Sequence, residues 1–183
     1  AYPGEHSTQE AAAAPEVTLT IQLVPGINWI SFNVVPADRA IQSVLGDLEF
    51  EQGNKLTCRF DRGATQVFAT WYDGYGWYLG AAEEQLAELD FTKAYKLESP
   101  VRQTLTVTGQ PIDPTTPIEV PVGWFWLPYY RQTAMDIADG ALPDFDFEFQ
   151  DGDYIKGSNG MSQYYPSYGV WYGSLTRLYP GMA

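Results

Sequence analysis

The sequence predicts a mainly β protein that consists of two homologous antiparallel β modules related by an approximate two-fold axis. Three observations lead to this fold class. Apolar and polar residues alternate in short segments that Gly, Pro, Asn and Asp interrupt. Blocks of sequence recur in the same order in the two halves. The 183 residues are 45% apolar, which is enough for two small cores, so each module is expected to be sandwich-like or a small barrel.

The expected boundaries follow from changes in composition along the chain. They are an extended N-terminal arm over residues 1–16, a first module over 17–109, a proline-rich linker over 110–117 and a second module over 118–183. The arm has few large apolar residues, whereas Val17–Leu23 alternates apolar and polar residues and predicts the first strand. Three prolines predict a stiff linker.

The internal repeat defines the remaining elements. The matched positions are Gly26 with Gly123, Trp29 with Trp126, Ala37 with Ala134, Leu45 with Leu142, residues 50–54 with 149–153, residues 71–78 with 164–172, and Leu86 and Leu89 with Leu175 and Leu178. Because these blocks keep their order, a duplicated module is predicted. Each module is expected to contain a strand around its first matched tryptophan and an aromatic hairpin with a glycine turn.

One short helix is predicted in each module. In the first, residues 36–45 begin with a proline, and Gly46 follows the last apolar residue, as is common at helix ends. In the second, residues 133–142 begin at Thr133, a residue type that caps helices, and stop before Pro143.

The charge balance excludes several partners. The chain has 23 acidic and 10 basic residues and a net charge of −13, whereas nucleic-acid binding needs clustered Lys and Arg. No apolar run approaches the roughly 18 residues of a membrane-spanning helix, so membrane insertion is not expected. Like charges on the protomers predict that added salt or divalent cation promotes self-association.

Catalytic chemistry finds little support in the residue types. His6, the one histidine, lies in the arm, and Cys58 is the one cysteine, so triad catalysis and zinc binding are not expected. The glycines at 157–160 lack the lysine and following helix of a phosphate loop. We therefore expect no enzyme activity and no cofactor, and assign no catalytic, cofactor-binding or metal-ligating residue.

Acidic residues near position 150 leave two other uses open. These acidic residues are Asp144, Asp146, Glu148, Asp151 and Asp153. Paired carboxylates could hydrolyse a glycosidic bond, and the turn at 150–153 could bind calcium, although it lacks the ligand spacing of an EF-hand. However, residues 144–150 alternate acid with phenylalanine, which favours a half-buried strand with a solvated acidic face.

The aromatic segments 71–78 and 164–172 also have two interpretations. Exposed Trp and Tyr rings stack on sugars in carbohydrate-binding proteins, whereas alternate aromatic residues of a hairpin can fill a core. Since both modules keep the segment, we favour a role in folding.

The final segment, residues 171–183, carries a resemblance. Together with the Gly-x-x-Trp strand and the aromatic hairpin, it resembles a tandem Trp/Gly-rich β module of bacterial surface and secreted proteins. This resemblance implies no catalytic residues. By its two-module organisation the chain also resembles the pyrenoid shell proteins of diatoms, which implies a protein sheet around the carbon-fixing compartment.

These observations together predict a non-enzymatic structural protein that binds copies of itself and forms a sheet, tube or shell. The alternative is a secreted carbohydrate-binding or adhesion module. The pyrenoid resemblance implies the plastid stroma, and the alternative implies the cell surface. Since Ala1 is not preceded by Met, we expect that a targeting segment was removed.

Module two is expected to lack strands that module one has. The sequence stops at Ala183, where the counterpart of Ala94 falls, so the strands that correspond to the end of module one are missing. An open sheet edge invites pairing with another segment. We expect the arm of a neighbouring chain to fill part of this edge, so deleting residues 1–15 should weaken assembly.

Overall fold

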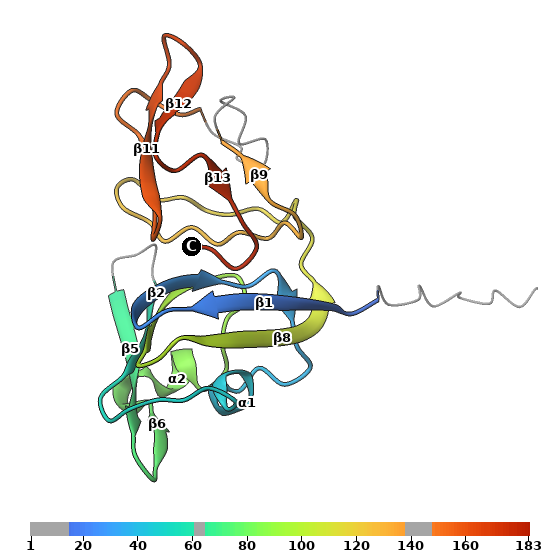
Figure 1. The fold of residues 1–183 in the computed structure, drawn as a ribbon, viewed down its shortest axis with the longest axis vertical. Coiled ribbons are helices and arrows are strands. Elements are labelled where there is room, and N and C mark those ends of the chain that lie inside the picture. Colours follow the sequence, from blue (N-terminus) through green and yellow to red (C-terminus); the bar gives the residue numbers. More distant parts are fainter. Residues whose placement is uncertain (1–14, 61–64, 138–147) are drawn as a thin grey trace, which may run out of the picture.

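The computed structural model describes residues 15–60, 65–137 and 148–183. The fold is mainly β, with 44% strand and 8% helix, which confirms the predicted fold class. All strand pairings in the described part of the chain are antiparallel, and none of its sheets closes into a barrel. The molecule is elongated, with one half of the sequence at each end of its longest axis (Figure 1).

The first half contains eight strands and all of the described helices. The elements are β1 (Val17–Leu23), β2 (Gly26–Ser31), β3 (Val34–Val35), α1 (Ile41–Leu45), β4 (Lys55–Phe60), β5 (Thr65–Tyr72), β6 (Gly76–Tyr78), the 3-10 helix η2 (Gly80–Ala82), α2 (Glu83–Leu86), β7 (Ala94–Ser99) and β8 (Gln103–Pro111). β8 continues two residues into the predicted linker, where Val34 pairs with Pro111.

Two sheets enclose the core of this first half. One has the order β2-β7-β4-β5-β6, and the other has the order β1-β8-β3. The alternation in β1 buries Leu19, Ile21 and Leu23 and exposes the polar residues between them, as predicted. These side chains belong to one continuous cluster with Phe32, Leu56 and Leu97, so the two sheets share a core.

The second half is smaller. Its elements are β9 (Met135–Asp136), β10 (Tyr154–Gly157), β11 (Gly160–Tyr165), β12 (Val170–Gly173) and β13 (Arg177–Leu178). β10, β11 and β12 form one sheet, and β13 pairs with β9. Their core contains Ile137, Trp171, Leu175 and Leu178.

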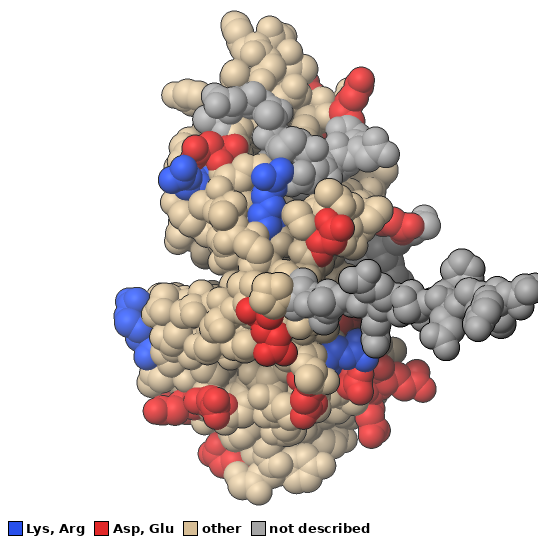
Figure 2. Space-filling model, turned by 90° about the vertical axis from the view of Figure 1, so that its right-hand side faces the viewer, with Lys and Arg blue, Asp and Glu red and all other residues tan. Residues whose placement is uncertain are grey.

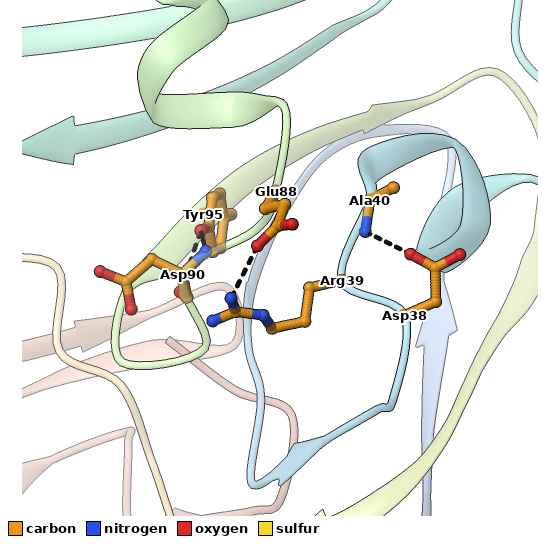
Figure 3. A network of polar contacts seen from close by, with 6 residues as sticks. All are labelled: Asp38, Arg39, Ala40, Glu88, Asp90 and Tyr95. Carbon is orange, nitrogen blue, oxygen red and sulfur yellow. Dashed lines mark hydrogen bonds and ion pairs between the residues drawn. The ribbon is translucent and has the colours of Figure 1, made fainter.

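The predicted helices require correction. In module one, Asp38 accepts a hydrogen bond from the Ala40 N–H at 2.9 Å (Figure 3). It accepts another from the Ser43 hydroxyl at 2.6 Å, and the helix begins only at Ile41. In module two the helix predicted over 133–142 is wrong as far as it is described, because β9 occupies part of residues 133–137 and the others there are not helical. Residues 138–142 lie outside the described residues.

The repeated blocks adopt matching geometry. In the first half, the rings of Phe50, Trp71 and Trp77 lie with centroids 4.7 to 5.7 Å apart. In the second half, Phe149, Tyr164 and Trp171 lie with centroids 4.9 to 5.6 Å apart. Both aromatic hairpins form as predicted, and these rings pack between sheet and turn in each half.

The turn before each hairpin repeats as well. Asn54 Oδ1 accepts a hydrogen bond from the Glu51 N–H at 2.8 Å, and Asp153 Oδ2 accepts one from the Gln150 N–H at 2.8 Å. The glycine that precedes each acceptor has a positive φ, 92° at Gly53 and 87° in the second half. The two modules therefore share a local structure as well as a sequence pattern.

Candidate functional site

The two modules are joined through buried polar groups at the end of β2. The Ser31 hydroxyl, which is fully buried, donates a hydrogen bond to the Met182 carbonyl and accepts one from the Tyr129 N–H at 3.0 Å. Next to it, the Asn33 side chain donates to the Arg131 carbonyl at 2.9 Å. A buried polar group lowers stability unless it is hydrogen-bonded, so these bonds fix the relative position of the two modules.

The segment 181–182 extends the first sheet. Met182 forms a bridge with Ile30, and the Ser31 N–H donates to the Gly181 carbonyl at 3.1 Å, on the side of β2 that β7 does not use. At Gly181 a Cβ would lie 2.6 Å from the side chain of Ile21, and φ is 86°, so only glycine fits without rearrangement. The edge of β2 is thus covered by the other module.

A cavity of about 960 Å³ lies between the modules. Its floor is the outer face of the five-stranded sheet, where Trp29, Arg59 and Lys96 are found. It is also lined by residues 120–127 and by residues between 149 and 157, which include β10. The cavity is open in part to solvent and large enough for a peptide segment or a drug-sized ligand.

Cations and tryptophans alternate across this cavity. Lys96 Nζ lies 5.3 Å from the ring centroid of Trp29 and 4.7 Å from that of Trp126. The Arg59 guanidinium lies 5.3 Å from the Trp126 centroid, and Lys156 Nζ lies 5.9 Å from that of Trp29. Three of the ten basic residues of an acidic chain thus gather at one place, where they favour an anionic partner.

Arg59 retains donor capacity at the cavity. One of its terminal nitrogens donates a long hydrogen bond, 3.4 Å, to the Trp124 carbonyl. Its Nε–H is buried and has no acceptor within the described part of the chain. A buried donor of this kind is costly unless a partner binds it, so it points to a ligand that carries an acceptor.

The cavity is lined by the segments that correspond to the two strands flanking β7 in module one. In the first sheet, β7 lies between β2 and β4 and pairs with both. The counterpart of β4 is β10, an edge strand that pairs only with β11 among the described elements. The strand expected around Trp126 is not formed, because the described residues offer 120–127 no partner corresponding to β7.

A second feature lies at the ends of the molecule. The turn between β5 and β6 and the turn between β11 and β12 lie at opposite ends of the longest axis (Figure 1). Tyrosines on these hairpins are strongly exposed: Tyr75 is 71% and Tyr78 52% exposed, and Tyr168 is 80% and Tyr172 76% exposed. The tryptophans of the same hairpins pack inward, with Trp77 and Trp171 buried.

The acidic candidates do not form a cluster in the described residues. Asp144 and Asp146 lie outside them, Glu148 and Asp151 are exposed, and Asp153 binds the backbone of its own turn. Within the described ranges no three His, Cys, Asp or Glu side chains could hold a metal ion. Residues 157–160 form the turn between β10 and β11, and His6 lies outside the described residues.

Acidic side chains lie on both modules on the face that Figure 2 shows. Asp and Glu side chains are scattered over upper and lower parts of the face in Figure 2, with fewer Lys and Arg among them. The Cys58 thiol and the Tyr130 hydroxyl are neutral at ordinary pH, because burial raises the pKa of each to about 12. Neither has the depressed pKa of an activated nucleophile.

Sequence reasoning missed the cavity, although its tryptophans were among the matched residues. Its cations are far apart in the sequence, and the topology alone brings them together.

Comparison with protein families, with curated proteins and with solved structures gives no match for this chain. None of the described helices has the length and apolar character of a membrane span.

Proposed function

We propose that the protein is a non-enzymatic structural protein that binds copies of itself and builds sheets, tubes or shells. The observation that carries this proposal is the pair of exposed tyrosine clusters, Tyr72, Tyr75 and Tyr78 at one end and Tyr168 and Tyr172 at the other, here called the tyrosine tips. Tyrosine is enriched at protein interfaces because its ring is apolar and its hydroxyl is polar.

The position of the tips suits repeated association. Each tip is built on the same hairpin of a duplicated module, and the two lie at opposite ends of the molecule (Figure 1). A molecule with two separate contact surfaces can bind one neighbour at each, and such contacts continue indefinitely unless the rotation closes a ring. In the tip of module one the tyrosine rings contact one another edge to face, with the Tyr72 and Tyr78 centroids 5.9 Å apart.

The test is electron microscopy of the full chain at rising protein concentration, with light scattering to follow assembly. We expect sheets or tubes, and we expect Y75A/Y78A and Y168A/Y172A to prevent them. A Tyr179→Ala variant is the matched control, because Tyr179 is 47% exposed but lies outside the tips. Assembly that both tip variants leave unchanged would contradict the proposal.

The alternative is a carbohydrate-binding or adhesion module, and the exposed rings of the tips favour it too. A protein that stays monomeric, binds polysaccharide and loses that binding in the tip variants would support this alternative. The pyrenoid shell is the particular setting that the two-module organisation suggests for the sheets. Antibody labelling of cell sections would test that setting.

A further inference from the structure

We infer that the cavity between the modules is a strand-binding slot, and that its occupant is the acidic arm, residues 1–16, of a second copy of the chain. This inference rests on the proposed self-association and names the segment and the site that carry it. The slot is lined by Trp29, Arg59, Lys96, Trp126, and the strand β10.

The first step of the argument is geometric. In module one, Leu56 of β4 pairs with Leu97 of β7, and Asn28 of β2 pairs with the same residue. The corresponding elements of module two, β10 and residues 120–127, both line the slot, and no described strand pairs with both of them. A segment inserted there would pair with the edge of β10 that no described strand occupies, and would complete a sheet like that of module one.

The second step is length. β7 has six residues, and a strand of that length spans about 20 Å at roughly 3.3 Å per residue. The sixteen residues 1–16 before β1 span about 50 Å when extended. One copy can therefore supply a strand of the required length and still have chain left to cross to its neighbour.

The third step is charge and side-chain size. The arm carries Glu5, Glu10 and Glu16 and neither Lys nor Arg, while the slot presents Arg59, Lys96 and Lys156 against Asp153. Among the described residues, the Nε–H of Arg59 has no acceptor, and a glutamate or a strand carbonyl of the arm would supply one. The alanine run at 11–14 presents small side chains to the tryptophan rings that crowd the slot.

The slot contacts and the net charge act over different distances. Repulsion between whole molecules at −13 is a long-range effect, and salt at 0.1 M shortens it to roughly 10 Å. The contacts in the slot are short and partly buried, so salt weakens them less. Binding of the arm is therefore compatible with assembly that salt promotes.

Cysteine cross-linking tests the occupant. Variants A12C and Y154C are mixed in equal amounts, one of them carrying a size tag, and oxidised mildly before electrophoresis without reductant. Tyr154 lies on β10 and is 44% exposed, so a cysteine there is accessible from the slot. We expect a mixed dimer that reductant dissolves. Cys58 is fully buried and does not interfere.

A matched control separates specific from random oxidation. E84C lies on the exposed side of α2, away from the slot residues, and mixed with A12C should give no mixed dimer above background. Cysteines at positions 11, 13 and 14 cover a shift of register. The absence of a cross-link at all four arm positions would overturn the inference. A fast-running monomer from the double variant A12C/Y154C, in place of dimers, would show that the chain's own arm is the occupant and would also overturn it.

Charge reversal tests the recognition. The variant E5K/E10K/E16K should lower the yield of mixed dimer roughly tenfold, as expected for three lost ion pairs. Adding K156E to the partner should recover part of the yield. If the reversed arm cross-links as efficiently as the original, charge does not select the arm and the inference fails.

The two proposals can fail separately. Sheets without an arm cross-link would overturn the slot and leave self-assembly in place. Mixed dimers without larger assemblies would support the slot and contradict a sheet-forming function.

Discussion

Arg39 and Glu88 form an ion pair at 2.6 Å that module two repeats with the charges exchanged (Figure 3). In module two, Arg177 contacts Asp136 at 2.7 Å. Asp136 follows Arg39 at the offset that relates Gly26 to Gly123, and Arg177 follows Glu88 at the offset of the matched leucines. In each module the ion pair joins the segment that was predicted to be helical to the segment that follows the aromatic hairpin. The contact is therefore kept in both modules, although the acidic and basic residues have exchanged places.

The exchanged pair predicts how module one responds to charge changes. R39E or E88R alone places like charges together and should lower the free energy of unfolding by about 0.5 kcal/mol, because both side chains are about half exposed or more. The double variant R39E/E88R should recover the loss. Urea unfolding followed by circular dichroism measures all three, and a double variant less stable than either single one would contradict this account.

The junction at Ser31 predicts a larger effect. S31A removes the acceptor of the Tyr129 N–H and the donor to the Met182 carbonyl in a buried place, which should cost about 1–3 kcal/mol. S43A is the control, because that hydroxyl binds Asp38 on the surface. Thermal unfolding should show a lower midpoint for S31A only. Equal midpoints for the two variants would mean that the junction contributes little.

Substitutions in the aromatic clusters should cause the largest losses in the free energy of unfolding. W77A removes a buried ring that contacts Phe50 and Trp71, and W171A does the same in module two, so each should cost about 3–5 kcal/mol. Y168A, at an 80% exposed position, should change stability by less than about 0.5 kcal/mol. Urea midpoints compare the three. A small effect of W171A would indicate that module two is packed loosely.

Cys58 predicts a loss of stability at alkaline pH. Its pKa is about 12 in the fold and near 8.5 when unfolded, so its contribution is complete below pH 8.5 and decreases as pH rises toward 12. Between pH 8.5 and 10 the loss should be about 2 kcal/mol, and C58A should show correspondingly less. Iodoacetamide at pH 8 should modify the thiol only after unfolding. Rapid modification of the native protein would contradict its burial.

The net charge predicts the response of assembly to salt. At −13 the protomers repel one another, and the range of this repulsion falls to roughly 10 Å at 0.1 M salt. Light scattering should therefore show assembly beginning at lower protein concentration as salt rises. A steady decrease with salt would mean that ion pairs between protomers dominate the contacts.

Local patterns predicted the elements whose structure depends on their own residues. β1 forms over Val17–Leu23 as its alternation indicates, because one face is apolar and must be buried. The aromatic hairpins form with Gly74 and Gly169 at positive φ in their turns. The core role of Trp77 and Trp171 was also predictable, since a duplicated aromatic residue is needed by each module.

Tertiary context decided the elements that sequence did not predict. The Asp38 side chain accepts a hydrogen bond from the Ala40 N–H, and the helix expected over 36–45 is shortened to α1. Residues 135–136 pair with β13 and are not helical, because a partner strand lies beside them. Trp126 has the sequence of a strand but lacks a neighbour to pair with among the described residues. Its own local pattern does not show this, although comparison of the two modules predicted that strands are missing from the second.

The bridge between Ile30 and Met182 has a consequence for synthesis of the chain. The two segments that meet at Ser31 are 151 residues apart in sequence, so the ribosome completes β2 long before its outer neighbour exists. Contacts between such distant segments slow folding, and an uncovered strand edge is prone to pair with other chains meanwhile. During synthesis, the edge of β2 therefore stays exposed and prone to aggregation until the last residues are made. The yield in cells should then depend on chaperones that bind exposed strands.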